Sequence, residues 1–100
     1  MEWFKDTFLP SFNFCKNKRI SEKQYDIFVK YLYDKYLYKE LDRNNACIQE
    51  YHIYNLIIII QSSHVGYGKG WNEYYLTIQW RRSKQVEKIN NLDKIKRMNG

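Results

Sequence analysis

The longest apolar run of this chain, Leu56–Ile60, constrains its fold more than any other feature. Five residues are too few to cross a bilayer, which takes about 20. Side chains of a strand point alternately to its two faces, so a strand that is apolar at every position is typically covered on both. The run therefore predicts a central strand of a sheet, with other elements packed on each face.

Strand periodicity continues on both sides of this run. Ala46–Ile53 reads as a strand, and Tyr54–Ser62 reads either as a second strand or as a continuation of the first. A glycine-containing loop follows over residues 63–72. A final half-buried strand is then predicted, which pairs antiparallel with its predecessor across a ten-residue tip. Its inward residues are Tyr74, Leu76, Ile78 and Trp80.

The clearest helix signal lies upstream of the strands. Ser21 and Gln24 have the spacing of a capping box, and the helix is expected to run from Ser21 to about Asp42. Its apolar side chains recur at helical spacing, which predicts a stripe that packs on the sheet. The stripe contains Tyr25, Phe28, Val29, Leu32 and Tyr36, and its expected partners are Ile57, Ile59, Leu76, Ile78 and Trp80.

Aromatic residues crowd the first fourteen positions, among them Trp3, Phe8 and Phe14. Such side chains are costly to leave in water, so this arm is expected to pack on the body and to cover the outer side of the main helix. A partner is the alternative cover. A basic loop, Lys16–Arg19, leads from the arm to the helix. A last helix is predicted after Ser83.

These patterns predict one α+β domain over residues 1–100. We expect a small antiparallel sheet of two to four strands within 46–82, packed by a long helix over 20–43. An aromatic arm and basic loop occupy 1–19, and a basic helix occupies 83–100. The arm, the last helix or a second copy in a homodimer would cover the second face of the sheet. Cys15 and Cys47 are expected to be free thiols of a cytoplasmic protein.

The sequence offers little for catalysis or metal binding. Its two histidines, His52 and His64, and its two cysteines lack the spacing of a zinc site. The glycines of 66–70 join two strands, whereas phosphate-binding glycine loops open a helix. Ser62 and Ser63 lack the elbow of a serine hydrolase. We expect no enzyme, no cofactor and no metal.

Charge is concentrated at the end of the chain. Residues 1–80 carry ten Lys and Arg against nine Asp and Glu, a net charge of +1, whereas residues 81–100 carry seven against two, a net charge of +5. A basic end suggests docking on a negative surface, either nucleic acid or acidic protein. Aromatic residues on the glycine loop would anchor the contact and the cations would steer it. The predicted binding residues are Tyr67, Lys69, Trp71, Tyr75, Arg81, Arg82, Lys84 and Lys88.

Lys, Asn, Ile, Tyr and Phe, whose codons are rich in A and T, make up 47 residues. In this composition and in the phrase Ile20-Ser21-Glu22-Lys23-Gln24, the chain resembles small proteins of phages, mobile elements and archaeal viruses with AT-rich genomes, a class that includes anti-CRISPR-type inhibitors. The resemblance implies a non-enzymatic protein that sterically inhibits a host or defence nucleic-acid-handling machine in the host cytoplasm.

Two further functions stay open. The alternative is a small basic DNA- or RNA-binding protein or regulator, for which nucleic acid is the direct partner. The third is a structural or dimeric viral protein. The expected partner of the inhibitor is a host or defence protein, free or in complex with nucleic acid, and no membrane partner is expected.

Overall fold

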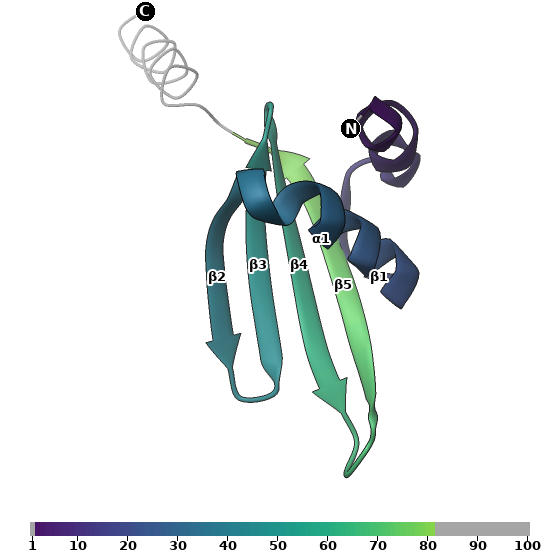
Figure 1. Ribbon diagram of the computed structural model, residues 1–100, viewed down its shortest axis with the longest axis vertical. Coiled ribbons are helices and arrows are strands. Elements are labelled where there is room, and N and C mark those ends of the chain that lie inside the picture. Colours follow the sequence, from purple (N-terminus) through teal and green to yellow (C-terminus); the bar gives the residue numbers. More distant parts are fainter. Residues whose placement is uncertain (1, 82–100) are drawn as a thin grey trace, which may run out of the picture.

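A computed structural model describes residues 2–81. They form one antiparallel sheet of five strands in the order β1-β5-β4-β3-β2, with α1 lying across one face (Figure 1). α1 connects the two edge strands, because β1 precedes it and β2 follows it. The elements are η1 (Phe4–Phe8), η2 (Leu9–Phe12), β1 (Cys15–Ile20), α1 (Glu22–Tyr36), β2 (Leu37–Arg43), β3 (Ala46–Ile53), β4 (Leu56–Val65) and β5 (Trp71–Trp80).

The predicted fold class is wrong in its sheet and in its helix. The sheet has five strands rather than two to four, and α1 ends at Tyr36, six residues before the predicted end at Asp42. Leu37–Arg43 forms β2, and the segment predicted as a basic loop, Lys16–Arg19, lies in β1. Both are edge strands exposed at most positions, so neither carries an apolar alternation that would reveal it. The predicted helix over 83–100 lies outside the described residues.

The strands between residues 46 and 80 pair in sequence. β3 and β4 are two strands joined by Tyr54 and Asn55, and β4 pairs antiparallel with β5, as predicted. The tip of this second hairpin is shorter than expected, because β4 continues to Val65 and β5 begins at Trp71. It contains only residues 66–70. The capping box is confirmed: the Gln24 backbone N–H donates to Ser21 Oγ, and the Ser21 backbone N–H donates to Gln24 Oε1.

The core lies between α1 and the sheet. Phe28 and Leu32 of α1 are fully buried against the sheet residues that face them. The expected partners Ile57 and Ile59 point to the opposite face, because the alternation of β4 places Ile58 and Ile60 inward. The predicted packing of Trp80 against the helix is also wrong, because this side chain is 63% exposed. The buried sheet residues are Gln49, Tyr51, Ile53, Ile58, Ile60, Tyr74, Leu76 and Ile78.

The aromatic arm packs beside α1, as predicted. Phe4 stacks on Tyr31 with ring centroids 5.1 Å apart, and Phe8 meets Phe28 edge-on at 5.1 Å. The arm and α1 therefore cover the same face of the sheet. Within residues 2–81 nothing covers the other face, although the apolar run of β4 predicts a cover there.

No helix formed by residues 2–81 is long and apolar enough to cross a membrane.

Candidate functional site

The sheet face opposite α1, here called the open face, presents one row of side chains from each strand. On β5 the alternation that buries Tyr74, Leu76 and Ile78 turns their neighbours outward. The pairing registers place the outward residues of the other strands beside them. The open face includes Arg19, Leu41, Ile48, Glu50, His52, Ile57, Ile59, Trp71, Glu73, Tyr75, Thr77 and Gln79.

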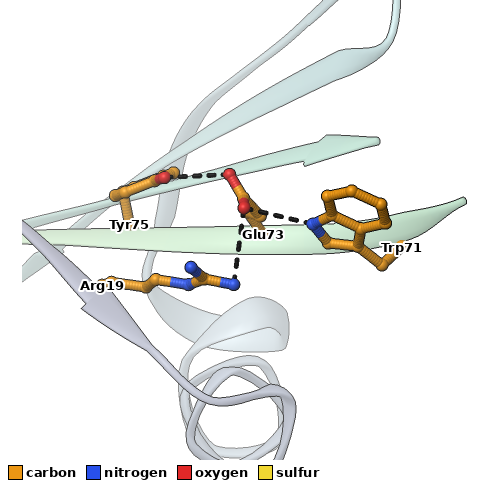
Figure 2. Close-up of polar contacts among 4 residues, drawn as sticks. All are labelled: Arg19, Trp71, Glu73 and Tyr75. Carbon is orange, nitrogen blue, oxygen red and sulfur yellow. Dashed lines mark hydrogen bonds and ion pairs between the residues drawn. The ribbon is translucent and has the colours of Figure 1, made fainter. Parts of the chain in front are cut away.

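Glu73 organises one corner of the open face (Figure 2). Its carboxylate accepts a hydrogen bond from Trp71 Nε1 at 3.1 Å and another from the Tyr75 hydroxyl at 3.0 Å. Arg19 Nη2 lies 3.4 Å from Glu73 Oε2. Trp71 and Tyr75 flank Glu73 on one strand, while β1 brings Arg19 opposite Tyr75. A single carboxylate thus orients two aromatic rings and a guanidinium.

The hydrogen bonds shift two pKa values in opposite directions. The pKa of Glu73 is lowered, chiefly by the Trp71 indole, then by the Tyr75 hydroxyl and by the positive charge of Arg19. The pKa of Tyr75 is raised, because its hydroxyl donates to the Glu73 carboxylate. At neutral pH, therefore, Glu73 is an ionised acceptor and Tyr75 a neutral donor. The two hydrogen bonds to Glu73 therefore fix the orientation of the Trp71 indole and the Tyr75 ring.

Trp71 and Arg19 remain available for contact. Trp71 is 54% exposed and the Arg19 side chain 62%, so both present most of their surface to solvent. Toward the middle of the sheet, Ile57 and Ile59 of β4 also face outward, and we call this pair the apolar strip. Their neighbours in the register are polar: Gln79 and Thr77 on β5, His52 and Glu50 on β3. The open face therefore has aromatic anchors at one corner and two isoleucines among polar side chains at its centre.

A second polar pair lies across this strip on β3. His52 Nε2 is 2.7 Å from Glu50 Oε2, and the Tyr38 ring stacks on the imidazole with centroids 4.0 Å apart. His52 is thus a strand residue whose polar partner lies two residues earlier on the same strand. Lys39 lies opposite Glu50 in the register, so the open face carries charges of both signs.

The predicted binding residues are divided between two ends of the molecule. Trp71 and Tyr75 lie together on the open face, and Trp71 begins β5 rather than lying in the glycine loop. Tyr67, fully exposed, and Lys69 lie in the adjoining tip. Arg81 follows the far end of β5, about 33 Å away at a strand rise of about 3.3 Å per residue. Arg82, Lys84 and Lys88 lie outside the described residues.

Sequence reasoning missed Arg19 and Glu73. The alternation of β5 contained the signal for Glu73, since it stands between Trp71 and Tyr75 in the outward row. No local signal existed for Arg19, because its place depends on the pairing of β1 with a strand more than fifty residues later.

The described residues hold no group of three or more His, Cys, Asp or Glu side chains that could bind a metal ion. Cys15 and Cys47 are both free. Burial and the neighbouring Asp42 raise the pKa of the Cys47 thiol to about 11, so it is protonated at neutral pH.

No protein-family model, curated protein or solved structure matches the chain.

Proposed function

We propose that this chain is a non-enzymatic binding protein that docks on a protein partner through its open face and blocks that partner sterically. The observation that carries the proposal is the corner where Glu73 holds Trp71 and Tyr75 beside the apolar strip. Tryptophan and tyrosine are the side chains that most often dominate binding energy at interfaces. Rings already held in place lose little conformational freedom when a partner binds.

The charge of the open face favours protein over nucleic acid as its partner. Arg19 is paired with Glu73, and further along the face Glu50 lies opposite Lys39. Phosphate groups laid across this surface would meet two carboxylates, whereas a protein surface can match both signs. The basic residues at 81–100 would steer the chain toward an acidic partner.

We propose that the partner is a host or defence machine that handles nucleic acid. The chain would be of phage or mobile-element origin and would inhibit this machine in the host cytoplasm. Size, composition and the basic end of the chain support this anti-CRISPR-type function. Because inhibitors that mimic nucleic acid are acidic, this basic chain would instead act on an acidic surface of the machine.

A second candidate function is direct binding of single-stranded nucleic acid. It is favoured by the edge strand β1, which carries Lys16, Lys18 and Arg19 and places Arg19 opposite Tyr75. In proteins that bind single strands, cations contact the phosphates of the nucleic acid while its bases stack on aromatic side chains. This function predicts that binding weakens steeply with salt and disappears after nuclease treatment.

The test is a pull-down of the tagged full chain from host lysate, with and without nuclease, followed by mass spectrometry. The variant combines Trp71→Ala with Tyr75→Ala, and the control is Trp3→Ala, which removes a 48% exposed indole on the other side of the molecule. Our proposal expects one nucleic-acid-handling protein that survives nuclease, persists in the control and is lost in the double variant.

Other outcomes would overturn the proposal. Recovery of nucleic acid alone would support the direct binder. A concentration-dependent dimer that dissociates in the double variant would support the structural protein. A partner retained by the double variant would show that the open-face corner does not bind it.

A further inference from the structure

A cavity of about 290 Å³ opens at the end of the sheet far from the 66–70 tip, on the face that carries α1. The N-terminal helices form one wall, and the ends of β4 and β5 form the other. Its walls are mostly apolar, because Leu9, Leu56 and Ile78 line it. The full lining is Lys5, Leu9, Pro10, Asn13, Phe14, Tyr54, Leu56 and Ile78.

Three exposed aromatic side chains gather at this cavity. Phe14 is 53% exposed, Tyr54 54% and Trp80 63%, and the rings of Phe14 and Trp80 pack with centroids 5.0 Å apart. Phe14 and Tyr54 line the cavity itself. Clusters of exposed apolar side chains beside a cavity are typical of binding sites, whereas single exposed ones are ordinary.

The backbone at Tyr54 adds a second, independent observation. Tyr54 begins the turn between β3 and β4 with a φ of 54°, in the left-handed region that glycine and asparagine adopt most readily. A bulky aromatic residue there is unfavourable for folding. The equivalent position of the β2–β3 turn, Asn44, has a φ of 50°, so the two-residue turn sets this conformation and tyrosine is the less favourable residue for it.

The charge at the cavity is positive. Lys5 is the one charged residue among the described residues that line it, and its Nζ lies 5.1 Å from the centroid of the Tyr54 ring. The described residues of the lining include no carboxylate.

We propose that the cavity binds one aromatic or branched aliphatic side chain from an acidic segment of a partner protein. The aliphatic walls exclude water around such a side chain, while Lys5 attracts the flanking carboxylates. A nucleobase fits less well, because its polar edge would be desolvated with few partners. Within residues 2–81, Asn13 and the Tyr54 hydroxyl are the only uncharged polar side-chain groups of the lining. This inference goes beyond the proposed function, because it concerns a different surface.

The experiment is a titration of the isotope-labelled full chain, followed by the backbone NMR signals of Asn13 and Asn55 and the indole signal of Trp80. The probe is a blocked pentapeptide in which a phenylalanine stands between two pairs of aspartates. One comparison peptide has alanine at the centre, and another has lysine in place of aspartate. An eight-nucleotide thymidine strand tests the nucleic-acid alternative. The expected result is saturable shifts at these positions with the first probe, and dissociation constants at least about tenfold higher for both comparison peptides.

The variant Tyr54→Asn separates binding from folding. Asparagine tolerates the positive φ, so the variant is expected to unfold at the same or a higher urea concentration, while its dissociation constant for the probe rises at least about tenfold. The control Tyr67→Asn removes an exposed ring at the other end of the sheet and should leave binding unchanged.

Three results would overturn the inference. They are equal binding of the alanine peptide, shifts caused by the thymidine strand in place of the peptide, and absence of saturable shifts with the first probe. Each leaves the open-face proposal standing, because that proposal depends on Trp71 and Tyr75 and is read from the pull-down.

Discussion

The hydroxyl of Tyr51 donates a 2.7 Å hydrogen bond to Oε1 of Gln49, two residues earlier on β3, and both side chains are buried beneath α1. Gln49 in turn donates through Nε2 to Glu40 Oε2 on the edge strand β2 at 2.8 Å. Burial raises the pKa of Tyr51 well above its ordinary value, so the hydroxyl is a permanent donor. A polar chain thus runs from the edge of the sheet into the core.

We expect Tyr51→Phe to destabilise the protein, because it leaves Gln49 Oε1 buried without a donor. The free energy of unfolding should fall by about 1–3 kcal/mol. Tyr75→Phe is the matched control: it also removes a hydroxyl that donates to a side chain, but at the solvent-exposed corner, where the change should be within about 0.5 kcal/mol. Urea denaturation measures both. An equal loss of unfolding free energy in the two variants would show that Gln49 Oε1 does not depend on the Tyr51 hydroxyl for its hydrogen bond.

The lowered pKa of Glu73 predicts a pH dependence. The ionised Glu73 carboxylate accepts the hydrogen bond of the Trp71 indole, so this contribution to stability is present at neutral pH. It is lost as the pH falls through the pKa of Glu73 in the folded state, which lies below the ordinary 4.5. The indole N–H signal of Trp71 should move with a midpoint below 4.5. In Glu73→Gln this titration should vanish. A midpoint at or above 4.5 in the unmodified chain would show that the indole and hydroxyl bonds do not hold the carboxylate.

Neighbouring isoleucines of β4 should respond differently to truncation. Ile58 has no exposed surface beneath α1, so Ile58→Ala should lower the free energy of unfolding by about 3 kcal/mol through lost burial and a cavity. Ile59 faces the open side, and Ile59→Ala should cost about 1 kcal/mol or less. Thermal or urea unfolding compares the two. Equal costs would show that something covers the open face of the intact chain.

Two glycines of the 66–70 tip should also differ. Both have positive φ, +64° at Gly68 and +41° at Gly70, so alanine strains the backbone at either position. At Gly68 a β-carbon meets no atom within 4 Å, whereas at Gly70 it would overlap the Val65 carbonyl oxygen. Gly70→Ala should therefore cost about 1–3 kcal/mol more than Gly68→Ala in urea denaturation. A larger loss for Gly68→Ala than for Gly70→Ala would show that Gly70 does not lie against the Val65 carbonyl oxygen.

Local features of the fold were predictable from the sequence. The start of α1 was predictable, because the side chains of Ser21 and Gln24 each accept a hydrogen bond from the other's backbone N–H within one turn. The β4–β5 hairpin was also predictable, since strict alternation from Tyr74 onward needs no distant partner to be recognised. For the candidate site, the outward row of Trp71 and Tyr75 follows from the same alternation.

The tertiary structure alone decided the rest. Leu37–Arg43 and Cys15–Ile20 are polar segments that become strands because β3 and β5 supply backbone hydrogen-bond partners from elsewhere in the chain. The same long-range pairing brings Arg19 to Glu73. In the uniformly apolar run of β4, no pattern distinguishes the inward isoleucines from the outward ones, so only the register with β3 and β5 decides that Ile58 is core and Ile59 faces the open side.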